Sequence, residues 1–210
     1  DPDVKDDDKD QAGQRREAYV ASDPLARLSA MKSLWGGTPD YARQVLTAYA
    51  AARLPVDKEL AKDAAPIIAS MLAAGLDRNA MPWSRVVDEG SLAWALLAVA
   101  QPLQQGAIPS SAVDSFVSDD KSSGQRKSRF LLAGLAGLGR LDQGDVNSLS
   151  GRLGLNLGDQ TKWTQAIDLA AQYRNPALVA LLAGLGMQGS GWDKMTARHL
   201  FHIVRALDQA

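Results

Sequence analysis

The sequence predicts an all-α protein of about ten helices, stacked as helical hairpins in an α-α superhelix or packed as a compact orthogonal bundle. Alanine and leucine dominate the chain, whereas isoleucine and threonine, which favour strands, are scarce. No segment alternates apolar and polar residues for long, as a half-buried strand would. A capping side chain followed by proline, which is typical of a helix start, recurs at Asp23-Pro24, Thr38-Pro39 and Asn175-Pro176.

Start and stop signals divide the chain into helices in order. Gly36-Gly37 and Gly75 each follow an apolar stripe and predict helix ends. Pro66 interrupts another stripe, so we expect a break or a kink at that residue. The expected helices cover residues 14–21, 24–35, 39–53, 57–74, 84–101, 110–118, 123–138, 143–153, 160–173, 176–185 and 192–208.

Apolar residues at helical spacing predict the faces that these helices bury. The stripe of the third helix is formed by Tyr41, Val45, Ala48, Tyr49 and Ala52. Three later helices carry the stripes Leu60, Ala64, Ile68, Met71 and Leu72; Trp163, Ile167, Ala170 and Ala171; and Leu200, Ile203, Val204 and Leu207.

Short similar segments recur along the chain. They are "MLAAGL" at 71–76 and "LLAGL" at 131–135 and again at 181–185, and each is followed by another helix after a short polar stretch. Recurrence of one helical segment is typical of stacked hairpins that bury a face against their neighbours. We therefore expect repeated helical hairpins.

The length suits one ordinary domain or two small ones, and 46% apolar and 22% charged residues are typical of a globular protein. We expect a single all-α domain over residues 14–210. Residues 1–13 have no apolar face, so we expect a disordered acidic segment or a tag. The first residue is not methionine, which indicates a fragment or removal of an export signal. The compartment stays open between the cytoplasm and an exported, periplasmic location.

Charge and cysteine content exclude several classes of protein. The net charge is −1, and the basic stretch "KSSGQRKSR" follows Asp119 and Asp120 directly, so we expect no nucleic-acid partner. The chain has no cysteine, which excludes disulfides, thiolate metal sites and a thiol nucleophile. No apolar stretch approaches the roughly 20 residues of a membrane span.

Gly184, Gly186 and Gly189 have the spacing G-x-G-x-x-G of a dinucleotide-binding loop. That loop requires a preceding strand and a second strand after the following helix, and the chain offers no second strand. We expect a helix end and an inter-helix turn instead, and no cofactor.

Two groups of residues could carry chemistry. Glu89 lies near Trp83 and Trp94, as the general acid of a small helical polysaccharide hydrolase would, although a helix junction explains the same pattern. His199 and His202 share a helix face and are weak candidates for metal ligands, which would need a further ligand. We favour a surface or groove-edge position for both histidines.

Tryptophans at helix ends typically pack between layers, but several exposed along one groove would be peptide anchors. The groove residues that we predict are Trp83, Trp94, Trp192, Arg198 and His202. The sequence favours a non-catalytic helical scaffold that binds a protein or peptide partner. The alternatives are the Glu89 hydrolase and a structural domain of a larger exported protein.

Overall fold

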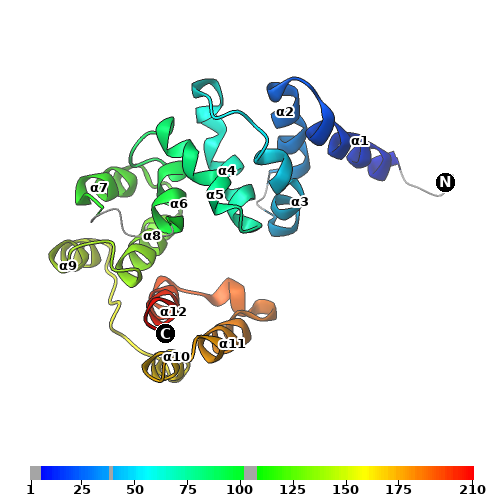
Figure 1. The fold of residues 1–210 in the computed structure, drawn as a ribbon. Helices are drawn as coiled ribbons and strands as arrows, with labels where there is room; N and C mark the ends of the chain where they lie inside the picture. Colours follow the sequence, from blue (N-terminus) through cyan, green and yellow to red (C-terminus); the bar gives the residue numbers. More distant parts are fainter. Residues whose placement is uncertain (1–5, 38–39, 102–107) are drawn as a thin grey trace. The chain divides into compact units, whose positions relative to one another are not determined.

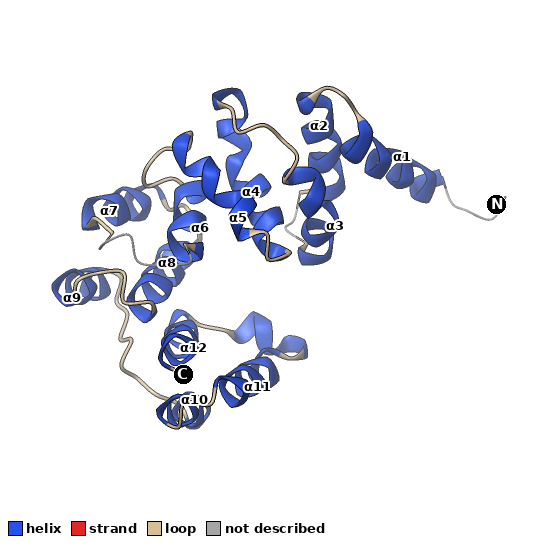
Figure 2. Cartoon of the chain, viewed as in Figure 1, coloured by secondary structure: helices blue, strands red, loops and turns tan. Residues whose placement is uncertain are grey.

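The computed structural model describes residues 6–37, 40–101 and 108–210, without the side chains of residues 6–9 and Trp192. In these ranges the regular secondary structure is entirely helical, which confirms the all-α prediction (Figure 2). The helices form consecutive packed pairs, including α1 with α2, α3 with α4 and α10 with α11 (Figure 1). No helix in this part of the chain is long and apolar enough to span a membrane.

Contacts divide the chain into two compact units, Asp1–Pro102 and Leu103–Ala210, where we expected one domain over 14–210. We describe each unit by itself. Helix α1 begins at Asp6, so residues 6–13 of the segment that we expected to be disordered are helical. Residues 1–5 lie outside the described residues.

The N-terminal unit contains most of the predicted helices, but the helix expected over 84–101 begins only at Leu92, because Met81–Arg85 form a 3-10 helix and Ser91 caps the helix that follows. Asp23 accepts hydrogen bonds from the amides of Leu25 and Ala26 and caps α2 where predicted. Thr38 and Pro39 lie outside the described residues, and Asp40 caps the next helix. The elements are α1 (Asp6–Val20), α2 (Pro24–Trp35), α3 (Tyr41–Ala51), η1 (Lys58–Asp63), α4 (Ala64–Ala73), α5 (Asp77–Ala80), η2 (Met81–Arg85) and α6 (Leu92–Ala100).

The break expected at Pro66 is present. The expected helix over 57–74 is split into the 3-10 helix η1 and the α-helix α4, which begins at Ala64. Pro66 therefore lies in the first turn of α4, where a backbone N–H has no partner within the helix and its loss costs little.

A buried polar network joins α2, α3 and α4. The indole nitrogen of Trp35 donates to the hydroxyl oxygen of Thr47 at 2.7 Å. That hydroxyl lies 3.0 Å from the hydroxyl of Ser70, which donates to the backbone oxygen of Gln44 at 2.7 Å. All of these groups are uncharged. The surrounding core includes the fully buried Met31, Ile67, Ile68, Met71 and Trp83.

The stripe predicted for α3 is wrong for its large residues. Tyr41, Val45 and Tyr49 are exposed, whereas Ala48, Ala50 and Ala51 are buried. α3 packs tightly against α4, and small side chains allow that close approach. The helix therefore buries alanines and turns its larger residues outward.

The C-terminal unit is built around its last helix, which packs against α8, α10 and α11. An ideal Cβ added to Gly137 would lie 3.0 Å from the backbone oxygen of Phe201, so glycine permits the close approach of α8 and α12. The elements are α7 (Ser110–Asp119), η3 (Ser123–Gln125), α8 (Arg126–Gly137), α9 (Gln143–Arg152), α10 (Lys162–Gln172), α11 (Pro176–Met187), η4 (Gly189–Lys194) and α12 (Ala197–Gln209).

The glycines with dinucleotide-loop spacing belong to a helix. Gly184 and Gly186 lie inside α11, and Gly189 follows it with a φ of +57°. The ring of Trp163 lies directly on Gly186, where a Cβ atom would overlap it. Its indole nitrogen donates to the backbone oxygen of Leu182 at 2.7 Å. The segment is therefore a helix end and a turn, as predicted.

Candidate functional site

A cavity of about 450 Å³ lies in the C-terminal unit, where the starts of α8 and α12 meet the segment 154–159. We call it the arginine pocket, because Arg126, Arg129 and Arg198 line it. The remaining lining residues are Ser123, Gly124, Phe130, Gly154, Leu155, Asn156, Asp159, Thr196 and Ala197. Its lining therefore carries three guanidinium groups and one carboxylate.

The two arginines of α8 form no ion pair within the described part of the chain. Arg126 stacks over Phe130, with its guanidinium carbon 4.6 Å from the ring centre, and donates to the backbone oxygen of Met195 at 3.3 Å. The Nε atom of Arg129 is buried and has no hydrogen-bond partner in the described residues. No carboxylate of the described residues therefore lies within ion-pair distance of either side chain.

Asp120, which precedes these arginines in the chain, binds other residues. Its carboxylate accepts hydrogen bonds from the backbone and hydroxyl groups of Ser122 and Ser128, at distances of 2.6 to 2.8 Å. Burial raises the pKa of Asp120, but these hydrogen bonds outweigh burial and lower it to about 2. Asp120 thus stabilises the start of α8 and forms no ion pair with Arg126 or Arg129.

The third arginine already holds a carboxylate. Arg198 Nη1 lies 2.9 Å from Asp159 Oδ2, and both side chains are about half exposed. Arg198 is at the start of α12, whereas Asp159 belongs to the loop before α10. The arginine pocket is therefore partly filled by an acidic group of the chain itself.

A second cavity, of about 630 Å³, lies beside α9 in the same unit. It is lined by apolar and amide side chains, among them Leu141, Val146 and Asn147. Arg205 contributes the positive charge of this cavity. Leu155 and Asn156 line both cavities, so one short segment separates them.

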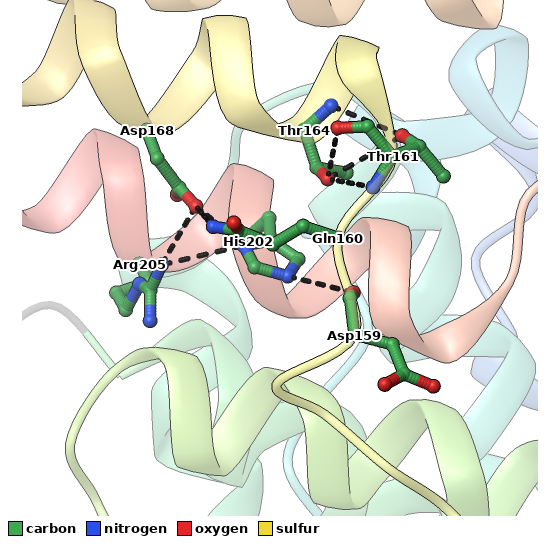
Figure 3. A network of polar contacts seen from close by, with 7 residues as sticks. All are labelled: Asp159, Gln160, Thr161, Thr164, Asp168, His202 and Arg205. Carbon is green, nitrogen blue, oxygen red and sulfur yellow. Dashed lines mark hydrogen bonds and ion pairs between the residues drawn. The ribbon is translucent and has the colours of Figure 1, made fainter.

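Figure 3 shows a network of polar contacts between α10, α12 and the loop that precedes α10. His202 is buried, with Nδ1 2.8 Å from Asp168 Oδ2 and Nε2 3.3 Å from the backbone oxygen of Asp159. Arg205 Nη2 lies 2.9 Å from the same carboxylate oxygen, to which Gln160 also donates at 2.7 Å. The network ties α10, α12 and the loop together.

The two histidines have different surroundings: His199 is half-buried, whereas His202, which we expected at a groove edge, is buried. His202 Nδ1 contacts both the carboxylate of Asp168 and Arg205 Nη2, and His202 Nε2 contacts the backbone oxygen of Asp159. His199 Nδ1 accepts from the amide of Thr196, which closes a capping box at the start of α12. Burial lowers the pKa of His199, and the charges of Arg198 and His202 lower it further. In the described residues no group of three histidines or carboxylates could hold a metal ion.

The other predicted site residues are dispersed. Glu89 is exposed in the turn before α6, so it lacks the burial that the hydrolase alternative requires. Trp83 is 1% exposed and packs in the core of the N-terminal unit, where it presents no surface to a partner. Trp94 is half-buried on α6, and the side chain of Trp192 lies outside the described residues.

Of the predicted groove residues, Arg198 lines the arginine pocket. Sequence reasoning missed Arg126 and Arg129 as site residues because Asp119 and Asp120 precede them in the chain. The signal that could have found them is the serine pattern around Asp120, since serine hydroxyls and amides bind carboxylates in capping turns.

α11 also carries an exposed apolar stripe. Leu178, Leu181 and Leu185, spaced three and four residues apart, are 40%, 58% and 59% exposed. We call these three residues the leucine face. The core side of α11 buries Val179 and Ala183 instead. Leu169 of the neighbouring helix α10 and Tyr173, which follows that helix, are also exposed.

Comparison of the chain with protein-family models, with curated proteins and with solved structures gives no match.

Proposed function

We propose that the chain is a non-catalytic interaction module that binds a partner protein through the leucine face of α11. The observation that carries the proposal is the exposure of three leucines on one side of a single helix. Contiguous exposed apolar side chains typically mark a surface that a partner covers. An amphipathic helix or an apolar groove of the partner would match the spacing of the three leucines.

The stacked helical hairpins support this role, because such arrays present extended surfaces to other proteins. The recurring "LLAGL" segments lie in α8 and α11, and we interpret them as parts of repeated hairpins. Fold analogy alone does not assign a function, so the leucine face is the element to test.

The test compares the full chain with the double variant Leu181→Glu/Leu185→Glu as bait in extracts of the source organism. Both leucines are exposed, so the variant should fold, which circular dichroism will verify. A bound protein should be recovered with the wild type and be at least tenfold depleted with the variant, because two charges cannot be buried against an apolar partner.

The matched control is Tyr41→Glu/Tyr49→Glu, which places two charges on the exposed stripe of α3 in the N-terminal unit. It should retain the partner. Retention of the same protein by the leucine-face variant would refute the proposal. Sedimentation of the wild type as a dimer that the variant abolishes would assign the face to self-association instead.

A further inference from the structure

The arginine pocket holds more positive charge than the unit compensates. Three arginines line it against one aspartate, and Arg126 and Arg129 form no ion pair in the described residues. Two guanidinium groups of the described lining therefore have no carboxylate at ion-pair distance, and this imbalance favours an anionic ligand.

The backbone adds to the attraction for anions. The lining residue Ser123 lies in η3, Arg126 begins α8, and Thr196, Ala197 and Arg198 lie at the start of α12. Helix N-termini carry partial positive charge. Because Asp120 already binds the start of α8, the start of α12 is the one that reinforces the field of the arginines. Guanidinium groups bind oxyanions through paired hydrogen bonds, which gives such a site directional selectivity.

The existing occupant indicates the class of ligand. The carboxylate of Asp159 lies on Arg198 at 2.9 Å, which demonstrates that a carboxylate on a side chain reaches the pocket and pairs there. Phe130 and Leu155 add apolar walls, and Asn156 adds an amide. This mixture suits the short methylene stem and the charged end of an acidic side chain.

We propose that the arginine pocket binds a carboxylate of an acidic peptide segment, with Arg126 and Arg129 as its principal donors and Asp159 as an internal competitor for Arg198. This inference rests on the proposed role as an interaction module, and it adds the chemical class of the partner segment. It concerns a different surface from the leucine face, so the two can fail independently.

The experiment is calorimetric titration of the full chain with acetylated tetraglutamate amide, tetraglutamine amide and inorganic phosphate at low salt. We expect saturable binding of tetraglutamate, no binding of tetraglutamine and weaker binding of phosphate. Arg129→Gln should weaken binding of tetraglutamate at least tenfold, because a charge-assisted pair of hydrogen bonds is lost.

Lys127→Gln is the matched control, since it removes the same charge from an exposed position of α8 that does not line the pocket. It should change the affinity less than twofold. Asp159→Asn should raise the affinity about threefold or more, because the competing carboxylate is gone while the amide keeps a similar shape.

Several results would overturn the proposal. The first is that tetraglutamine binds as tightly as tetraglutamate. The second is that Arg129→Gln leaves the affinity for tetraglutamate unchanged, and the third is that Asp159→Asn lowers this affinity. Phosphate bound more tightly than the peptide would assign the pocket to phosphate groups instead. The Leu181→Glu/Leu185→Glu variant should bind tetraglutamate like the wild type, which separates failure of this proposal from failure of the leucine face.

Discussion

The two units of the chain are built from similar packed helices but are fastened by different kinds of polar interaction. In the N-terminal unit, Trp35, Thr47 and Ser70 form an uncharged network inside the core. In the C-terminal unit, Asp168 forms an ion pair with Arg205 and a hydrogen bond with His202, which makes a charged network. An uncharged network specifies how helices meet without responding to pH, whereas a charged network couples helix packing to the state of each partner.

The distribution of titratable groups reinforces the difference. Both histidines of the chain belong to the C-terminal unit. The same unit holds the carboxylate of Asp120, with a pKa lowered to about 2. We therefore expect pH changes and charge-removing substitutions to alter the stability of the C-terminal unit more than that of the N-terminal unit. Hydrogen exchange of the full chain, followed by mass spectrometry, measures the two responses separately.

The largest effect is expected for Asp168→Ala. The substitution leaves the buried His202 and the partly buried Arg205 without their acceptor, which should destabilise the C-terminal unit by about 3 kcal/mol. Hydrogen exchange should accelerate in α10 and α12 and stay unchanged in α2 to α4. Asp114→Ala, which removes the exposed ion pair with Arg152, is the control and should cost less than about 1 kcal/mol. Equal effects of both variants would contradict the role of the network.

A pair of glycine substitutions sharpens the comparison within the C-terminal unit. A Cβ at Gly186 would overlap the ring of Trp163, so Gly186→Ala should destabilise the unit by about 2 kcal/mol. Gly184 has no atom within 4 Å of its Cβ position. Gly184→Ala should therefore stabilise α11 by about 0.5 to 1 kcal/mol. Thermal unfolding will measure both, and effects of the same sign would contradict this packing.

In the N-terminal unit, Thr47→Val should cost about 1.5 kcal/mol, because the indole N–H of Trp35 loses its acceptor in a buried site. Thr47→Ser keeps the hydroxyl and should cost less. Urea titrations of both variants at pH 5 and pH 7 test whether the loss is independent of pH. If the free energy of unfolding lost by Thr47→Val differed between pH 5 and pH 7, the network would be coupled to a charged group.

The smallest effect is expected for pH itself. Burial lowers the pKa of His199, and the charges of Arg198 and His202 lower it further, so the folded state favours the neutral ring, which accepts a hydrogen bond through Nδ1. The stabilisation is complete above the ordinary pKa of 6.5 and is lost as the pH falls from there toward the lowered value. Hydrogen exchange at pH 7 and pH 5 should show faster opening of α12 at pH 5.

His199→Gln preserves an acceptor for the capping box without a titrating ring and should reduce this pH dependence. The N-terminal unit, which has no histidine, is the internal control. An equal response of both units to pH would remove the contrast between them.

Much of the fold could be predicted because its signals are local. Asp23-Pro24 and Asn175-Pro176 position the starts of α2 and α11, since a capping side chain and a proline act within one helical turn. The burial of α3 could not be predicted in the same way. Which face of α3 is buried depends on the close approach of α4, so the alanines are buried and Tyr41 and Tyr49 are exposed.

The site was harder to predict because it depends on contacts between distant segments. Arg198 was predicted to lie in a groove, but its partner Asp159 is 39 residues away. The sequence placed His202 at a surface, whereas the structure buries it against Asp168 of another helix. Proximity along the chain misleads most at Asp120, whose carboxylate binds serines rather than the nearby arginines.

The central position of α12 has a consequence for the order in which the protein folds during synthesis. The helices of the N-terminal unit have all been synthesised once residue 102 has emerged from the ribosome. The C-terminal unit cannot complete its core until residues 197–209 follow, because α12 packs against α8, α10 and α11. Ribosome-bound chains that stop before α12 should therefore display a protease-resistant N-terminal unit and a C-terminal unit that is cleaved.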